Sequence, residues 1–201
     1  SGNGYQRLRP SSPVRAQGDG LPGYDAGSLL GLPEITANTF SEIAIDHSKL
    51  APFDQERVHR IRSRDLFIGP LVVVHKSPPA VTGRVGVSIS REDAVFNETF
   101  YGYSPGEFSD ARGLTQYLAL VLGSQLAVWF ALVTSGEFGF EREVIEKATL
   151  DRIPLPDFRK FKREKIIEIK ALYRGLRAGE VTWQEIDEWT ANLYGLGRRD
   201  L

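Results

Sequence analysis

Basic side chains gather in one stretch of the sequence, between residues 57 and 84. The stretch holds one acid, Asp65, and six basic residues: Arg57, Arg60, Arg62, Arg64, Lys76 and Arg84. If its first part is an extended strand, Arg60, Arg62 and Arg64 share one face. An arginine fork fits a phosphate group and also the O6 and N7 acceptors of guanine. The alternative interpretation is a solvated strand edge whose charges guard against aggregation.

Residues suited to catalysis are few. The chain has no cysteine, which excludes disulfides, thiolate zinc sites and a cysteine nucleophile. His47, His59 and His75 lie far apart and show no metal-binding spacing. Ser104 stands in "GYSPG", but Pro105 has no amide to supply at the turn that a serine nucleophile needs. No phosphate-binding glycine loop occurs either. We therefore expect no catalytic residue, metal or cofactor in this chain.

One short motif needs separate treatment, the Ser77-Pro78-Pro79-Ala80 run that follows an apolar strand. Enzymes that methylate the amino group of a DNA base carry Asp, Asn or Ser before Pro-Pro and an aromatic residue, whose ring stacks on the flipped base. Here alanine takes the place of that ring. We therefore interpret the run as a rigid loop that leaves a strand.

Composition places the chain among ordinary globular proteins. Of its 201 residues, 41% are hydrophobic and 25% charged, and the net charge of −1 gives no global attraction to nucleic acid or membrane. The absence of cysteine fits a reducing compartment, and no secretory signal is present, so we expect a cytoplasmic location. The chain also lacks methionine, and we expect it to be part of a longer or processed protein.

The predicted elements change character along the chain, which indicates an α+β fold. Residues 1–33 are rich in Gly, Pro and Ser and are predicted to be a linker or extended arm. Strands are predicted over 66–76, 84–90 and 94–104, the second with Val85, Val87 and Ile89 on one face. Asp110 is predicted to cap a single helix that runs through Trp129 and is apolar nearly all round. We interpret it as a buried core helix rather than a membrane span.

The last part of the chain is predicted to be helical. Residues 157–178 form a strongly basic helix, and residues 182–194 form an acidic one that opens with a capping box of Thr182 and Glu185. The basic helix either follows a DNA backbone or pairs with the acidic helix in a hairpin, in which Trp183 and Trp189 are packing anchors. We favour the hairpin. The predicted organisation is an arm over 1–33, an α+β domain over 34–156 and a helical extension over 157–201.

The order of pieces from Phe67 to Phe158 resembles a known family. "FIGPLVVVHKSPP" is followed by "GRVGVSIS", "AVFNETFYGYS", the helical "YLALVLGSQLAVWF" and the closing "LDRIPLPDF". This order resembles the C-terminal target-recognition domain of N6-adenine DNA methyltransferases, as found in type IIG and related restriction–modification enzymes. The likeness covers roughly residues 50–160. "LGSQL" stands at the helix motif, with Gly123 where the family often has Asn.

The resemblance implies a non-catalytic domain that recognises the sequence of double-stranded DNA. It implies a catalytic methyltransferase domain and an S-adenosylmethionine site elsewhere in the parent chain. Under it, the DNA contacts fall on the basic stretch and the loop that leaves the strand: Arg57, Arg60, Arg62, Arg64, Lys76, Ser77 and Arg84. Two other functions remain open. One is a protein–protein interaction module that docks through the helical hairpin, and the other is a hydrolase or nuclease with an unrecognised site.

Overall fold

The computed structural model describes residues 1–8, 21–78, 82–135 and 144–196. At its centre is a five-stranded sheet in the order β1-β10-β7-β8-β4. Its strands are β1 (Gly2–Asn3), β10 (Phe100–Tyr103), β7 (Leu71–His75), β8 (Val87–Ser90) and β4 (Ile43–Ala44). All neighbours are antiparallel except β4 and β8. The strands predicted over 66–76 and 84–90 contain β7 and β8, whereas the one predicted over 94–104 divides into β10 of this sheet and a separate strand, Val95–Phe96. The α+β prediction is confirmed.

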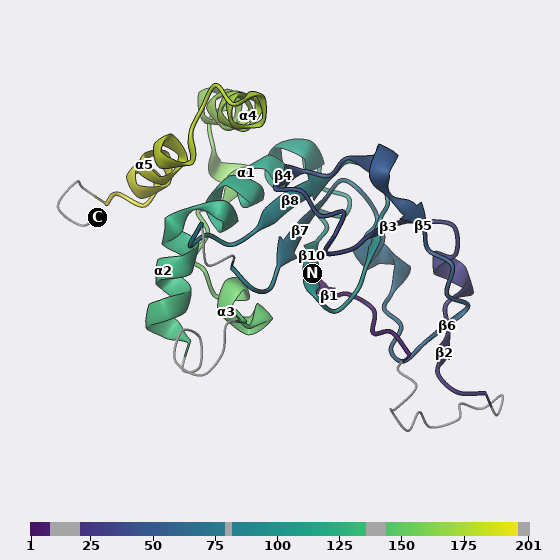
Figure 1. Cartoon of the computed structure of the whole chain (residues 1–201). Helices are drawn as coiled ribbons and strands as arrows, with labels where there is room; N and C mark the ends of the chain where they lie inside the picture. The colour runs from purple at the N-terminus through teal and green to yellow at the C-terminus, as the bar shows by residue number, and fades with distance from the viewer. Residues whose placement is uncertain (9–20, 79–81, 136–143, 197–201) are drawn as a thin grey trace.

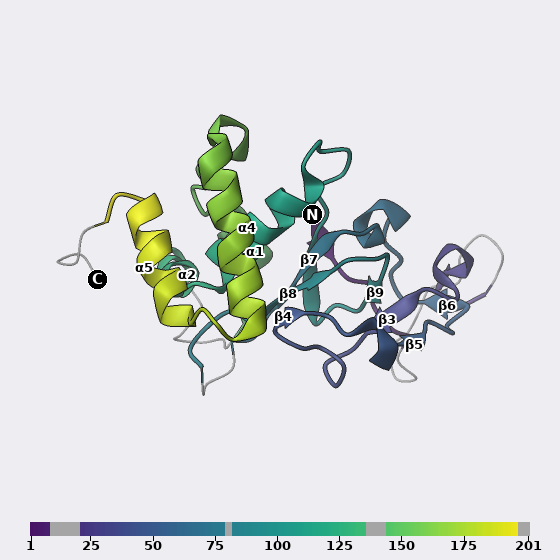
Figure 2. The same ribbon diagram turned by 90° about the horizontal axis from the view of Figure 1, so that it is seen from above.

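Shorter strands form two smaller sheets beside the central one. β5 (Ala51–Pro52), β3 (Pro33–Ile35) and β9 (Val95–Phe96) make a three-stranded sheet, and β2 (Tyr24–Asp25) pairs with β6 (Arg57–Val58). Short 3₁₀ turns join these pieces: η1 (Gly27–Leu29), η2 (His47–Lys49) and η3 (Arg64–Phe67). In Figures 1 and 2 they lie on one side of the central sheet, and the longer helices lie on the other.

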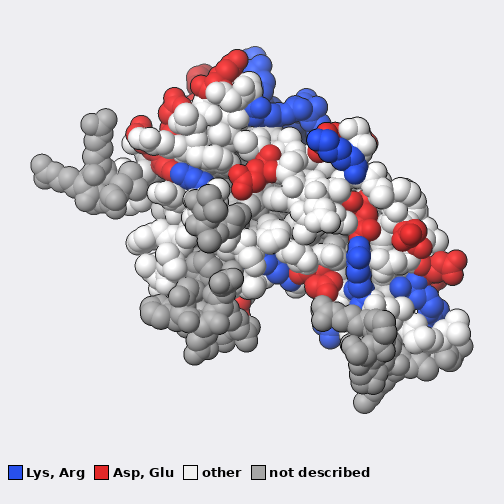
Figure 3. All heavy atoms as spheres, in the orientation of Figure 1, with Lys and Arg blue, Asp and Glu red and all other residues white. Residues whose placement is uncertain are grey.

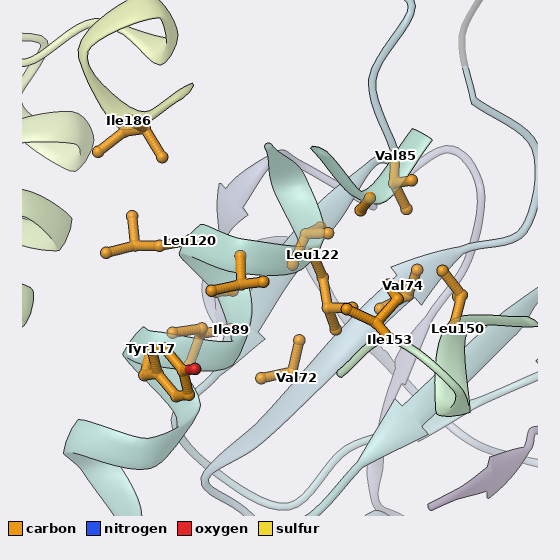
Figure 4. Packing of buried hydrophobic residues seen from close by; sticks show 14 of the residues in the cluster. Val72, Val74, Val85, Ile89, Tyr117, Leu120, Leu122, Leu150, Ile153 and Ile186 are labelled. Atoms are coloured by element: carbon orange, nitrogen blue, oxygen red, sulfur yellow. The ribbon is translucent and has the colours of Figure 1, made fainter. Parts of the chain in front are cut away.

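The central strand β7 explains this two-sided arrangement. Leu71, Val72, Val73 and Val74 are all fully buried, as expected for a strand that is covered on both faces. Val72 and Val74 face the helices, while Leu71 and Val73 face the core beneath the small sheets. Val87 and Ile89 of β8 join the helical side together with Val85, as their alternation predicts (Figure 4).

Residues 1–33, which we expected to form a linker or arm, are in their described parts built into the fold. β1 is an edge strand of the central sheet, paired through Gly2 with Gly102. Tyr5 and Leu29 are fully buried in the second core. In the described parts, the glycines stand at turns and at close approaches of the backbone. Gly4, for example, lies against the backbone of Phe96 and Asn97, where a Cβ atom would clash.

The predicted single core helix is two helices. α1 (Ala111–Gly123) ends where Ser124 turns extended, and α2 (Gln125–Thr134) continues at an angle of 61°. The Trp183 ring packs against Gly123, where a Cβ atom would lie only 2.4 Å from it. Close approach of another helix therefore coincides with the break. α1 is largely buried, whereas α2 buries only Ala127 and Ala131. The prediction of one buried helix was wrong because α2 keeps an exposed apolar face.

The C-terminal part also differs from its prediction at one end. Residues 157–162 are not α-helical: η4 (Phe158–Lys160) follows the short α3 (Lys147–Asp151), and α4 runs over Arg163–Ala178. α5 (Trp183–Leu193) has the predicted capping box of Thr182 and Glu185. Ile169 of α4 and Ile186 of α5 are fully buried in the same core cluster as Val72. The helical extension is thus part of the fold, because α4 packs on α1 and β4, and α5 packs on α1 and α2.

Candidate nucleic-acid interface

The arginines of residues 57–64, which we call the arginine segment, mostly bind the chain's own backbone. Arg57 donates from Nε to the carbonyl of Pro22 at 2.9 Å and from Nη2 to that of Gly23 at 2.6 Å. Arg62 Nε donates to the Gly4 carbonyl at 3.3 Å. These two side chains fasten the N-terminal residues onto the fold.

Arg64 and Arg60 complete the segment. Arg64 donates to the Ser28 carbonyl at 2.6 Å and pairs with Asp93 at 3.4 Å. Arg60 is exposed, and its side chain has no acceptor within the described ranges. The strand β6 ends at Val58, and Arg60 continues the pairing only as an isolated antiparallel bridge to Gln6. Arg64 begins η3, so the three arginines do not lie on one continuous strand.

The remaining predicted residues lie at the other end of the basic stretch. Lys76 is half-buried with its ammonium 4.8 Å from the centre of the Tyr101 ring, and desolvation lowers its pKa. The Ser77 amide donates a hydrogen bond to His75 Nδ1 at 3.2 Å. Pro79 and Ala80 of the Ser-Pro-Pro-Ala run lie outside the described residues. Lys76 is therefore only partly available to an external anion.

Arg84 is a structural clamp. Both of its terminal nitrogens bind the carboxylate of Asp187 on α5, one of them at 2.7 Å, and its guanidinium lies 5.4 Å from the Trp183 ring centre. The same carboxylate accepts the Gln125 amide at the start of α2, at 2.9 Å. Arg84 thus joins the approach to β8 to two helices. We expected the acidic helix to pair with the basic helix, but Asp187 of the acidic helix pairs with Arg84 instead.

A second group of basic side chains comes together in the fold although its members are not consecutive in the sequence. We call it the basic groove: two adjoining hollows between the turn after β8, the start of α1 and the face of α4. The hollows have volumes of about 450 and 500 Å³ and share Arg91, Arg112, Gln116 and Tyr173 in their walls. The charged residues that line them are one acid, Asp110, and five cations: Arg91, Arg112, Lys170, Arg174 and Arg177.

The phase of α4 explains one wall of the basic groove. Ile169, Tyr173 and Leu176 form the buried stripe of the helix at the spacing i, i+4, i+7. Lys170, Arg174 and Arg177 repeat that spacing one residue later, so they line the border of the buried stripe. Figure 3 shows basic side chains, with acidic ones beside them, along the upper edge of the molecule, where Figure 1 places α4.

The other walls come from the sheet and from α1. Arg91 follows β8 directly, and Arg112 lies in the first turn of α1, whose cap is Asp110 with its carboxylate on the Gly113 amide. Tyr173 ties α4 to β4 by donating to the Ile43 carbonyl at 2.6 Å. Ile43 has a φ of 73°, a strained value for a β-branched residue, so this bond holds an unusual backbone in place.

The groove cations lack the internal acceptors that the arginine segment has. Among the described residues, the side chains of Arg91, Arg112 and Arg177 make no hydrogen bond or ion pair. Lys170 and Arg174 are the exceptions. Lys170 pairs with Asp110 at 2.8 Å and neutralises the one acid in the wall, and Arg174 Nε donates to the Lys170 carbonyl at 3.3 Å. Burial raises the pKa of Tyr173, and the positive charges of Arg177, Arg91 and Arg112 act against that rise. The groove therefore presents positive charge that is available to an external anion.

Sequence reasoning found only part of this site. The run of Lys170, Arg174 and Arg177 was visible as a basic helix, but Arg91 and Arg112 are isolated in the sequence. Their convergence depends on how α1 packs between the sheet and α4. A signal that could have been used is the one-residue offset between the buried and basic stripes of α4.

Other site types are absent from the described parts of the chain. No group of three or more His, Asp or Glu side chains there could hold a metal ion. No single helix there is long and apolar enough to cross a membrane, and α1 with α2 reaches that length only as the bent pair. Searches of protein-family models and of curated proteins found no match to this chain.

Proposed function

We propose that this chain recognises double-stranded DNA as the non-catalytic specificity domain of a cytoplasmic N6-adenine DNA methyltransferase in a restriction–modification system. The basic groove carries the proposal, because four exposed arginines and a lysine face solvent with a single neutralised acid among them. Phosphate contacts of this kind supply most of the affinity for DNA and fix its position on the protein. The order of strands and helices from Phe67 to Phe158 supports the assignment to a methyltransferase.

The chemistry of such an enzyme lies outside this chain. S-adenosylmethionine and the catalytic loop are expected in the catalytic domain of the same parent protein. The contribution of the present residues is to hold the duplex by its phosphates and to present side chains to the bases. The arginine segment, which we expected to do this, mainly stabilises the fold, so the DNA contacts move to the basic groove.

Fluorescence anisotropy with labelled duplexes of mixed sequence tests the proposal. We expect binding at about 50 mM salt that weakens at least tenfold by about 200 mM, because several condensed cations are released from the DNA. Arg152→Gln is the matched control, since it removes an exposed cation beside α3, at the other end of the helical part from α4 (Figure 1). Absence of binding at low salt would contradict the proposal for this chain.

One observation favours the second candidate, a protein–protein interaction module. α2 exposes 59% of Trp129, 46% of Leu132 and 58% of Val133, which together form an apolar face. Exposed apolar patches of this type mark contact sites for other proteins. This function predicts salt-insensitive association with another subunit of a larger assembly, abolished by Trp129→Ser and unaffected by charge removal in the basic groove.

A further inference from the structure

A third hollow adjoins the basic groove and differs from it in charge. It has a volume of about 550 Å³ and shares the side chains of Arg91 and Arg177 with the groove. Three acids also line it: Glu42, Asp46 and Glu92. A carboxylate beside a phosphate-binding surface repels DNA unless it is paired within the protein or meets a hydrogen-bond donor of the ligand. The partners of these acids therefore decide what the hollow can contact.

The carboxylates of Asp46 and Glu92 have opposite surroundings. Asp46 accepts the Ser48 amide at 3.2 Å and the Ser48 hydroxyl at 2.6 Å, and it pairs with Lys49 at 3.1 Å. The Glu92 carboxylate makes no hydrogen bond within the described residues. It lies 3.9 Å from His47 Nδ1, which is farther than a hydrogen bond reaches, and its side chain is 73% exposed. Glu92 therefore keeps a carboxylate for a donor outside the protein.

The turn that carries Glu92 is held in place by the fold. The Glu92 carbonyl accepts the Ser90 hydroxyl at 2.7 Å, and the Asp93 carboxylate accepts the Gly69 amide at 3.0 Å. Gly69 lies so close to this turn that a Cβ atom on it would be 2.5 Å from the carbonyl carbon of Glu92. Because the main chain is fixed on both sides, the side chains of Arg91 and Glu92 start from defined positions. Such preorganisation is what a specific contact requires.

An unpaired carboxylate beside a phosphate-binding arginine suits one kind of base edge. An ionised carboxylate only accepts hydrogen bonds, and the major-groove edges of guanine and thymine present acceptors that repel it. Adenine presents a donor next to an acceptor, whereas cytosine presents its N4 amino donor alone. Cytosine is therefore the base that such a carboxylate contacts best. The neighbouring arginine can at the same time bind a phosphate of the same duplex.

We propose that Glu92 is a specificity-determining residue, which accepts a hydrogen bond from the N4 amino group of a cytosine in the major groove while Arg91 holds a nearby phosphate. This inference rests on the proposed function for its duplex and adds the base that is preferred at one position. The cytosine stays paired, because the contact is made to its outer edge. The competing role for Glu92 is repulsion of phosphate without regard to sequence.

Selection from a random duplex library with the whole chain tests the contact. Anisotropy with the selected duplex and its single-base-pair variants then measures the preference at each position. We expect one position at which C·G is bound about tenfold more tightly than the other pairs, the effect of one good edge contact. Glu92→Gln should remove this preference and favour A·T there, because a glutamine amide pairs with adenine N6 and N7. A C·G preference that is unchanged in Glu92→Gln would overturn the inference.

Glu42→Gln is the matched control, because it removes a carboxylate from the same hollow and leaves Glu92 in place. We expect it to raise the affinity for every sequence by the same small factor, through weaker repulsion of phosphate, and to keep the C·G preference. If Glu92→Gln has this effect instead, Glu92 only repels phosphate and the inference is overturned. Both variants should melt within about 2 °C of the wild type, because the replaced side chains are exposed.

The same measurements separate this inference from the proposed function. A preferred sequence that does not depend on Glu92 would overturn the inference and leave the proposed function standing, with its base contacts on other residues. Salt-dependent binding with no preferred sequence would overturn both the inference and the assignment to a specificity domain. Absence of binding at low salt would overturn the inference together with any binding of DNA by this chain.

Discussion

Two groups of arginines in this protein have opposite surroundings. In the arginine segment, Arg57, Arg62 and Arg64 each donate to a backbone carbonyl of residues 4 to 28. In the basic groove, Arg91, Arg112 and Arg177 have no partner among the described residues. The first group is close in sequence and serves the fold, while the second is scattered and leaves its charge for another molecule. We therefore expect an anion to bind where arginines lack internal acceptors rather than where they are densest in the sequence.

The largest effect on stability is expected at Arg84, the cation of the basic stretch that binds a carboxylate through both of its terminal nitrogens. Its side chain is 14% exposed and that of Asp187 is 16% exposed. Arg84→Ala leaves the Asp187 carboxylate partly buried without its partner, which should lower the free energy of unfolding by about 3–5 kcal/mol. Urea denaturation measures this loss. Arg84→Met combined with Asp187→Leu should lose much less, and a loss below about 1 kcal/mol in the single variant would contradict the clamp.

Arg57→Gln tests the structural role of the arginine segment. We expect a loss of about 1–2 kcal/mol, because the hydrogen bonds of a charged donor are strong but this side chain is partly exposed to water. Limited proteolysis should become faster in residues 21–23, whose carbonyls Arg57 binds. Affinity for DNA should stay unchanged in the folded variant. A loss of DNA binding without a loss of stability would show that the segment serves the interface instead.

Two tyrosines, Tyr5 and Tyr194, should make the stability of the protein depend on pH. Burial, and then the hydrogen bond to Glu34, raise the pKa of Tyr5 under the small sheets; burial raises the pKa of Tyr194 beside α5 to about 12. Because these folded values exceed the ordinary tyrosine value of about 10, their contribution is full below pH 10. It is lost as the pH rises toward the folded values.

Denaturation between about pH 9 and pH 11.5 measures this loss. We expect roughly 1 kcal/mol to come from Tyr194 after allowance for its partial exposure. Tyr194→Phe should reduce the decline, and Tyr5→Phe should do so on the other side of the sheet. Removal of Arg91 and Arg177 should raise the pKa of Tyr173 further, since both charges favour its phenolate. Stability that is flat up to pH 11.5 would contradict these shifts.

The smallest effect is expected at Arg60. It is exposed and its side chain has no acceptor in the described part of the chain, so Arg60→Gln should change stability by less than about 0.5 kcal/mol. This variant also separates the arginine segment from the basic groove most clearly, because Arg60 is the arginine of the segment whose charge has no partner among the described residues. A reduction in DNA affinity as large as that from Arg91→Gln would extend the interface to the arginine segment.

The elements that were predicted correctly depend on local patterns, and those that were missed depend on distant contacts. The apolar run of β7 and the alternation of Val85, Val87 and Ile89 are local patterns, and both were predicted. The capping box of α5 is local as well. The break after Gly123 was missed because its cause, the approach of Trp183, comes from a helix sixty residues away. The burial of Tyr5 was missed for the same kind of reason.

The candidate site shows the same division between local and distant causes. Arg57, Arg62 and Arg64 were assigned to DNA because a sequence does not show which carbonyls lie within reach of an arginine. Arg91 and Arg112 were overlooked because neither has a basic neighbour in the chain. Only the packing of α1 between the sheet and α4 brings them beside Lys170 and Arg174.

The most direct test of this comparison is the salt dependence of duplex binding in two charge-removal variants. In the plot of log K against log salt, replacing Arg91, Arg174 and Arg177 with Gln should reduce the magnitude of the slope by about 3, one unit for each lost phosphate contact. Replacing Arg60 and Arg64 with Gln should leave the slope unchanged. A slope that falls with the arginine segment and persists without the groove cations would contradict the account.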